Sequence, residues 1–316
     1  MPFDFSAVSA PFRMQPGLRR LDEGAAQLTP NHIGDRALRE KLAVLGSHSS
    51  HALLCTPGFD AEPMLRTLCR HAVAEHPGAV SWDGDKTLCA THLGWSLRGH
   101  EFHGDGPPEI GACLSKLSVP WRLPALLCLA FAEDFAVIDG VTGHIPWLAV
   151  CLPSHWAPEE KVGRHFAEVH APVADNQLLI TASDHLARLV TGQDRWERFV
   201  WNITTEPRLH MHPHHGDRAP WLRDAGADAL AAQAFFRTER QTFIPLPAQR
   251  QAIFTIHVEV QPLLLAMADA GRALQLHDAL ASMSAAVLGY RGLTTARDRL
   301  LVWLRGRSAL SGPIAP

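Results

Sequence analysis

The stretch FFRTERQTFIPLPAQRQAIFTIHVEV, residues 235–260, decides the fold. It holds two extended runs, FFRTERQTFIPLP and QAIFTIHVEV, which meet at a short proline-containing turn and predict a β-hairpin. In the second run the apolar and polar residues alternate: Phe254, Ile256, Val258 and Val260 against Thr255, His257 and Glu259. This period of two predicts a strand with one buried and one polar face. On the first strand, Arg237 and Glu239 then share a face and Arg240 lies on the other.

The segments around this hairpin predict an α+β domain. Residues 35–45 and 61–76 have the apolar spacing of helices, and RLPALLCLAFAEDFAVI (122–138) is typical of a helix that runs into a strand. The turn 139–144 and the run 145–153 complete another hairpin. Residues 79–118 contain short extended pieces, residues 210–226 form a loop, and residues 261–306 are helical. Strands in the middle of the chain with helices around them favour an α+β architecture.

The composition is that of a soluble globular protein. Of 316 residues, 47% are hydrophobic and 19% are charged, and the net charge of −3 gives no reason to expect nucleic acid or an anionic membrane as a partner. The N-terminal MPFDFSAVSAPFRM has no signal-peptide pattern, and the most apolar run meets acidic residues too soon to cross a membrane. The six cysteines contain no CxxC pair, which argues against zinc ribbons and iron–sulfur ligation. We therefore expect a cytoplasmic protein with reduced thiols.

A second segment, EEKVGRHFAEVHAPV (159–173), predicts a helix that ends at Pro172. At 100° per residue, Val162, Phe166 and Val169 share its apolar face, and His170 falls within that arc. His170 is thus expected to be buried at the helix end. A buried neutral imidazole needs a partner for each nitrogen, or a metal on one of them. From the residues alone, a core histidine bonded to a carbonyl is the favoured reading and a metal ligand is the alternative.

Three other constellations admit two interpretations each. The run HMHPHH (210–215) has the look of a metal site, although solvated loop histidines are favoured because no Glu or Cys accompanies it at a usual spacing. Glu133 and Asp134 lie at a helix–strand junction, either half-buried with raised pKa values or simply capping a turn. Arg237 and Glu239 form either a cross-strand ion pair, the commoner arrangement, or an anion clamp. Nucleotide-binding, hydrolase and zincin motifs (GxGxxG, GxxxxGK[ST], GxSxG, HExxH) are absent from the sequence.

Several motifs together resemble the family of haem-dependent oxidative N-demethylases. They are PSHW (153–156), KVG (161–163), VHAPV (169–173), RTERQT (237–242) and YRGL (290–293), and the likeness covers roughly residues 11–305. The chain departs from the family pattern in having Val200 before Trp201 with Asn202 after it, and His257 where arginine is expected.

The resemblance implies a haem b in a PAS-like fold, in which an antiparallel sheet and surrounding helices form the haem pocket. The whole chain, 1–316, would be one haem-binding domain, with a PAS-like core of roughly residues 80–260, an N-terminal helical extension and C-terminal helices. It also implies a monooxygenase subunit that uses O2 to remove the N-methyl group of a small, dimethylamine-like amine and releases formaldehyde. Electrons would come from a separate reductase that carries FMN, a 2Fe–2S cluster and NADPH.

The resemblance also gives roles to particular residues. His170 is expected to be the proximal iron ligand, with His212 and His257 as rivals. Arg237 and Arg240 are candidate partners of the haem propionates, and Glu133 or Glu239 is a candidate counter-charge for the amine. The alternatives are a non-catalytic haem-binding sensor or carrier of PAS type, and a non-haem histidine metal site at residues 210–215.

Overall fold

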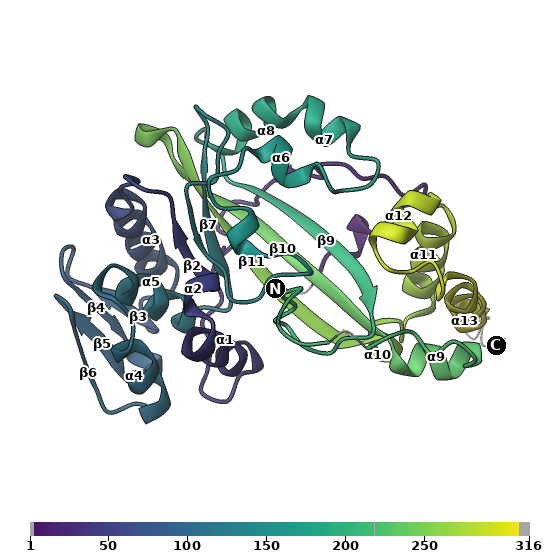
Figure 1. Ribbon diagram of the computed structural model, residues 1–316, viewed down its shortest axis with the longest axis horizontal. Helices are drawn as coiled ribbons and strands as arrows, with labels where there is room; N and C mark the ends of the chain where they lie inside the picture. The colour runs from purple at the N-terminus through teal and green to yellow at the C-terminus, as the bar shows by residue number, and fades with distance from the viewer. Residues whose placement is uncertain (1–2, 218, 310–316) are drawn as a thin grey trace.

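The larger of two β-sheets organises the molecule. The computed structural model describes residues 3–217 and 219–309, and within them seven antiparallel strands have the order β1-β9-β10-β11-β7-β8-β2. Their bounds are β1 (Arg19–Arg20), β2 (Leu53–Cys55), β7 (Asp134–Asp139), β8 (Trp147–Ala149), β9 (Trp196–Thr204), β10 (Phe235–Leu246) and β11 (Gln251–Pro262). Figure 1 shows β9, β10 and β11 as long strands that cross the centre of the molecule. The predicted α+β class and both predicted hairpins are confirmed.

The hairpin of β10 and β11 turns at the 3₁₀ helix Pro247–Gln249 and at Arg250, which has a left-handed φ of 54°. Its register places Arg240 opposite His257 and Glu239 opposite Val258. The predicted division into one buried and one polar face is wrong for the middle of β11, where Thr255 is fully buried. Helices cover both faces of the sheet, so polar side chains on either face must find partners inside the protein.

The register defines the two faces. One face carries Arg198, Val200 and Asn202 of β9 opposite Gln241, Glu239 and Arg237 of β10; we call it the His170 face, because the segment with His170 packs on it. The other carries Glu197 and Phe199 opposite Thr242 and Arg240, with His257 and Thr255 on β11; we call it the Glu133 face.

The N-terminal part of the chain covers the Glu133 face. Its helices are α1 (Arg36–Ser47), α2 (Ser49–Ala52), α3 (Glu62–Glu75), α4 (Pro108–Ser115) and α5 (Val119–Ala130). A second antiparallel sheet has the order β3 (Val80–Trp82), β4 (Thr87–Ala90), β5 (Trp95–Arg98) and β6 (Glu101–Gly104). Met64 and Leu68 of α3 and the buried side of α5 join one core with Val137 and Ile253 of the large sheet. The predicted helices 35–45 and 61–76 and the predicted helix-to-strand run 122–138 are confirmed.

The His170 face is covered by a separate group of short helices. They are α6 (Phe166–His170), α7 (Gln177–Thr181) and α8 (Ser183–Val190), which lie together beside the large sheet in Figure 1. Val162 and Val169 pack on Phe254 and Ala136 of this face.

The C-terminal helices α9 (Ala227–Gln233), α10 (Leu263–Ala266), α11 (Ala270–Ala281), α12 (Ala285–Tyr290) and α13 (Arg297–Ala309) enclose a core around Trp201 and Phe236. None of the helices in the described ranges combines the length and the apolar run that a membrane crossing requires.

The predicted single helix over 159–171 is wrong. Pro158–Glu160 is a 3₁₀ helix, and the chain then bends at Gly163, whose φ is 75°. Residues 163 and 164 bond to Ile145 instead of continuing a helix: Gly163 N donates to Ile145 O at 2.7 Å, and Ile145 N donates to Arg164 O at 3.0 Å. A new helix, α6, begins after His165, which accepts from Ala167 N and forms a capping box with Glu168. The hydrogen bonds to Ile145 form in place of a continuous helix, because Gly163 can adopt the left-handed backbone conformation that the bend requires.

Candidate functional site

His170 is the last residue of α6 and is half-buried against the His170 face. Its Nδ1 lies 2.8 Å from the carbonyl oxygen of Phe166, one turn earlier in the same helix. A carbonyl can only accept, so Nδ1 carries the proton and Nε2 keeps its lone pair. No described residue bonds to Nε2. The local helix therefore fixes the tautomer in which Nε2 is available as a ligand atom.

The surroundings of His170 keep its imidazole neutral. Burial disfavours the imidazolium, and Arg198 and Lys161 add positive charge nearby; together they lower the pKa of His170 to about 4, although the bond to Phe166 O opposes the shift. At neutral pH the ring is thus uncharged. A neutral, oriented imidazole is the form that binds a metal.

Arg198, on β9, lies close enough to His170 to act on its pKa, and its guanidinium is incompletely satisfied. Its Nε is buried and has no hydrogen-bond partner among the described residues. Burial lowers the pKa of Arg198, and Glu239 opposes this effect. A buried cationic donor without an acceptor is costly to a protein. The group is chemically suited to receive an anionic ligand.

Glu239 occupies the centre of the same face. It is buried, and Gln241 Nε2 donates to its Oε2 at 2.6 Å. The carboxylate also acts electrostatically on Arg198, Arg237 and the phenol of Tyr290. Partial burial and Glu239 raise the pKa of Tyr290, while Arg291 opposes them. His170, Arg198, Glu239, Gln241 and Tyr290 thus gather from α6, β9, β10 and α12 on one side of the sheet.

Arg237 shares this face, as predicted, but its donors are used within the protein. Its Nε donates to Ser154 Oγ at 2.7 Å, and its terminal nitrogens donate to the carbonyls of Arg208 and Leu209 at 3.0 and 2.8 Å. Burial lowers the pKa of Arg237 to about 10, opposed by Glu239. Neither the predicted cross-strand ion pair nor an open clamp describes this arrangement. Arg237 fastens the segments 152–154 and 208–209 to β10.

Glu133, His257 and Arg240 lie on the opposite face of the sheet. Glu133 Oε1 is 3.0 Å from His257 Nδ1, and Thr29 N donates to Oε2 at 2.9 Å. Burial alone would raise the pKa of Glu133, yet His257 and the Thr29 amide lower it below its usual value. Both interpretations of Glu133 and Asp134, half-buried acids with raised pKa values or a solvated turn cap, are therefore wrong: the two acids are fully buried, the pKa of Glu133 is lowered, and Asp134 lies 3.0 Å from Lys41 Nζ.

Arg240 on the Glu133 face is held by hydrogen bonds and has a small cavity beside it. Arg240 Nε donates to Glu197 Oε2 at 2.9 Å, and its Nη1 donates to Ala26 O at 2.8 Å. The space next to Arg240 and His257 measures only about 10 Å³. That is about the volume of one water molecule.

The third histidine candidate, His212, belongs to a cluster. The interpretation of residues 210–215 as solvated is wrong for His212, which is 4% exposed, and right for His214. His212 Nε2 lies 3.0 Å from Glu159 Oε1, and its Nδ1 accepts from His214 N at 3.2 Å. Both nitrogens are thus engaged, in contrast to His170.

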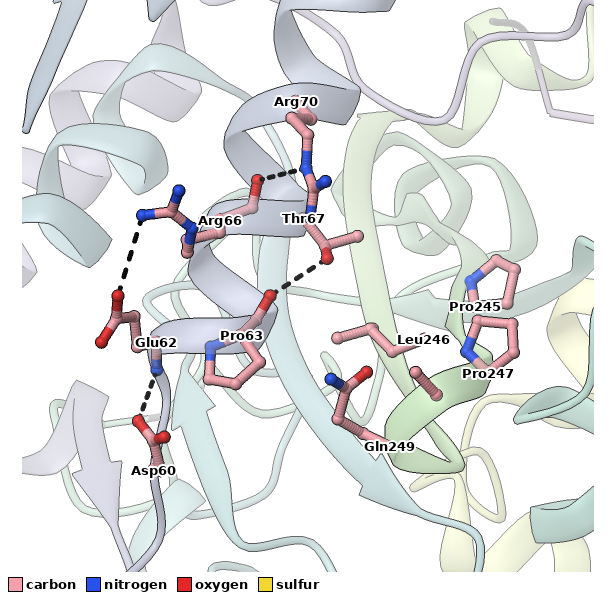
Figure 2. Close-up of a pocket in the computed structure, with 11 residues that line it drawn as sticks. Asp60, Glu62, Pro63, Arg66, Thr67, Arg70, Pro245, Leu246, Pro247 and Gln249 are labelled. Carbon is pink, nitrogen blue, oxygen red and sulfur yellow. Dashed lines mark hydrogen bonds and ion pairs between the residues drawn. The ribbon is translucent and has the colours of Figure 1, made fainter. Parts of the chain in front are cut away.

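A groove of about 500 Å³ lies between α3 and the turn of the β10–β11 hairpin. Figure 2 shows Arg66, Thr67 and Arg70 of α3 on one side and Leu246 and Gln249 on the other. Both arginines interact within their own helix: Arg70 Nε donates to Arg66 O, and Arg66 Nη1 lies 3.7 Å from Glu62 Oε1. The predicted site residues are not part of its lining. We therefore place the candidate site on the His170 face.

Sequence reasoning missed Arg198, Gln241 and Tyr290 as site residues. Gln241 follows Glu239 by two positions on β10, so the same alternation that placed Glu239 also places Gln241 on its face. Tyr290 is the single tyrosine of the chain and stands in the YRGL motif. Arg198 had no such signal, because its role depends on which residue of β9 pairs with Gln241.

A comparison with protein-family models shows to which family the chain belongs. Residues 36–301 match the model described as haem-dependent oxidative N-demethylase, alpha subunit-like. The matched range contains α6, the β10–β11 hairpin and α12, and so all the elements of the candidate site. The chain belongs to the haem-dependent oxidative N-demethylase, alpha subunit-like family.

Proposed function

We propose that this chain is the haem-carrying subunit of a monooxygenase that removes an N-methyl group from a small, dimethylamine-like amine. The single observation that carries the proposal is the state of His170: Nδ1 is bonded to Phe166 O and Nε2 is unbonded by any described residue. This is the arrangement of a proximal histidine, whose second nitrogen is held by a backbone carbonyl. His170 would hold the iron of a haem b.

Besides His170 itself, Arg198 on the His170 face suits a porphyrin. The buried Nε of Arg198 lacks an acceptor, so a haem propionate would satisfy it with a charge-assisted hydrogen bond. Among the predicted propionate partners, Arg237 donates to protein carbonyls, and Arg240, which keeps one unpartnered nitrogen, is ion-paired with Glu197 on the other face. We therefore assign the propionate role to Arg198 first.

Glu239 is the candidate group for amine recognition. When bound, the haem supplies the activation of O2 that oxidises the N-methyl group; formaldehyde and the shorter amine are the expected products. The amine arrives protonated at neutral pH, and the nitrogen must lose this proton before it is oxidised. Glu239 lies on the His170 face and can accept a hydrogen bond from the ammonium, while Gln241 orients its carboxylate at 2.6 Å. Glu133 is the weaker candidate because it is paired with His257 on the other face.

The electrons would come from a separate reductase that carries FMN, a 2Fe–2S cluster and NADPH. The sequence contains no GxGxxG motif after a strand and no CxxC pair. The alpha subunit-like family name fits a chain that works with partners. The cytoplasm, where such a reductase and NADPH are found together, is the expected location.

The test begins with haem binding. Purified protein reconstituted with hemin should show a Soret band at one haem per chain, and His170→Ala should lose it while His257→Ala keeps it. Reduced, aerated protein should then release formaldehyde from dimethylamine or another N-methyl amine when an artificial electron donor or a cognate reductase is added. Absence of haem binding in the wild type contradicts the proposal at its first step. Haem binding without formaldehyde release from a panel of N-methyl amines supports instead a haem sensor or carrier.

Substitution of Glu239 tests amine recognition separately. Glu239→Gln keeps the size and the hydrogen bond to Gln241 but removes the charge, so KM for the amine should rise about tenfold or more, the usual effect of losing one charged hydrogen bond. Glu133→Gln is the matched control on the other face and should leave KM unchanged. A KM that responds to Glu133 and not to Glu239 would reverse the assignment.

A further inference from the structure

Five histidines and one glutamate converge at a second place, apart from the His170 face. His51 comes from α2, Glu159 from the 3₁₀ helix Pro158–Glu160, and His210, His212 and His215 from the loop after β9. His48, between α1 and α2, stacks on His215 with ring centroids 3.8 Å apart. Segments more than 100 residues apart in the chain thus bring their imidazoles together.

The ligand atoms of three of these histidines lie within reach of a single ion. One nitrogen from each of His51, His212 and His215 falls within 4.8 Å of the others. His51 Nδ1 is 3.0 Å from His215 Nε2, and Glu159 Oε1 is 3.0 Å from His212 Nε2 and 3.8 Å from His51 Nδ1. Around a tetrahedral zinc ion with bonds of about 2.0–2.1 Å, neighbouring ligand atoms are roughly 3.3 Å apart. The His51–His215 and His212–Glu159 distances are close to this value, and the Glu159–His51 distance is somewhat longer.

A relay of hydrogen bonds prepares His215 as a ligand. The carbonyl of Cys151 accepts from His210 Nδ1 at 2.6 Å, which leaves His210 Nε2 as an acceptor. His210 Nε2 is 3.1 Å from His215 Nδ1, so His215 donates there and keeps the lone pair on Nε2. That lone pair points to His51. Zinc-bound histidines are commonly oriented by such a partner on their second nitrogen.

The loop that carries His210, His212 and His215 is firmly held. The loop is anchored because Glu40 Oε2 accepts from the amides of Leu209 and His210 at 2.8 and 2.7 Å. Met211 is further tied by a bond of 3.0 Å to Pro153 O. A fixed backbone holds the imidazoles in position for an ion.

We infer that His51, His212 and His215 form a binding site for a divalent transition-metal ion of the zinc class, with Glu159 as the carboxylate that completes and neutralises it. The ion would take the place of the protons that now lie between His51 and His215 and between His212 and Glu159; the proton of His212 would move to Nδ1, which then gives up its bond from His214 N. His212 stacks on His215 with centroids 3.9 Å apart, so its ring must turn out of that stack to aim Nε2 at the ion. His51 is half-exposed and can move its proton to the nitrogen that faces solvent.

Cobalt titration provides the test, because Co²⁺ in a tetrahedral histidine site absorbs in the visible region and zinc displaces it. Untagged, metal-free protein without haem should bind one Co²⁺ per chain and lose the band when Zn²⁺ is added. His51→Ala and His215→Ala should each weaken binding by about 100-fold or more, since loss of a ligand exceeds the effect of losing a supporting group. His214→Ala is the control: its ring is exposed and outside the set, so its affinity should match that of the wild type.

Two outcomes overturn the proposal. The first is the absence of a cobalt band and of stoichiometric zinc in the wild type. The second is binding that is as strong in His51→Ala and His215→Ala as in His214→Ala. His51 is half-exposed, so His51→Ala should keep the fold, and its circular dichroism and melting temperature verify this. His170→Ala should bind cobalt as the wild type does, so failure of the haem proposal and failure of this one are distinguishable.

Discussion

The two faces of the large sheet carry similar residue types in different states. On the Glu133 face, the charged groups are paired with each other, Glu133 with His257 and Arg240 with Glu197, although Arg240 Nη2 and Gln27 Oε1 are buried without a hydrogen-bond partner among the described residues. On the His170 face, His170 Nε2 has no bond from a described residue and Arg198 Nε is buried without an acceptor. The chemistry of the side chains alone does not separate the faces, because each has a histidine, an arginine and a glutamate.

The two faces differ in the pairing of their charges: Arg240 forms an ion pair with Glu197 at 2.9 Å, whereas no described residue forms one with Arg198. A polar group that has all its partners within the chain contributes to the fold, and its removal leaves the partner unpaired. A buried donor or ligand atom without a partner indicates a place where another molecule completes the set. The predictions below contrast matched residues of the two faces.

The largest effect is expected from the two histidines. His170→Ala should lower haem affinity by more than about 100-fold, beyond the usual effect of losing a supporting residue around a metal. His257→Ala should leave haem affinity unchanged and lower stability instead, because Glu133 loses its partner. Hemin titration followed by the Soret band measures the first, and urea unfolding of the haem-free protein measures the second. Equal haem loss in both variants would remove the distinction between the faces.

The second effect concerns the acid of the Glu133 face. Glu133→Ala should lower the free energy of unfolding by about 3 kcal/mol, as expected when one partner of a buried ion pair is removed. Its carboxylate accepts from Thr29 N and lies beside His257, so two polar groups are left behind. Glu239→Ala is the comparison and should cost less, since the half-buried Gln241 is the only described residue that hydrogen-bonds to the Glu239 carboxylate. Urea unfolding curves of the two variants decide the order.

The two arginines give a smaller contrast. Arg198→Leu should lower haem affinity about 10–100-fold, the equivalent of one charge-assisted hydrogen bond. Arg240→Leu should leave haem affinity within about threefold of the wild type, because its guanidinium donates to Glu197 and Ala26 O on the other face. Titrations of both variants with hemin measure the ratio. A greater loss in Arg240→Leu would return the propionate role to that residue.

The smallest effect is a pH dependence of stability. The folded state lowers the pKa of Glu133 below its ordinary value of 4.5, so the unfolded state takes up the proton first as the pH falls. The stability that this group contributes is therefore fully present above pH 4.5 and is lost as the pH falls below it. Unfolding curves between pH 6 and pH 3 should show a shallower decline in Glu133→Gln than in the wild type. Parallel curves would show that Glu133 does not set this dependence.

Local sequence determined much of the fold. The alternation of β11 and the proline-containing turn at residues 245–247 predicted the hairpin and the face shared by Arg237 and Glu239, and the register agrees. The helix that runs into β7 was equally predictable, because its apolar residues and its acidic end are contiguous. These features depend on residues close in the chain.

The candidate site was predictable only in part. His170 could be singled out because its segment is short and its motif is distinctive, whereas the shape of that segment could not. Helical periodicity favoured one helix, yet Gly163 bonds to Ile145, which is 18 positions earlier, and this long-range bond divides the segment. The hydrogen-bond acceptors of Arg237 could not be predicted either, because they lie in segments 28–85 residues away in the chain.

The sequence by itself determined which residues can do chemistry: an imidazole after a capped turn, two acids, two arginines and a run of histidines. The tertiary structure decided which of them are already satisfied. Strand pairing places Arg198 and Glu239 on one face of the sheet and Arg240 and His257 on the other. The position of helix α2 places His51 next to His215. Hydrogen bonds and ligand geometry act over about 3 Å. Only the folded chain fixes such distances between residues remote in sequence.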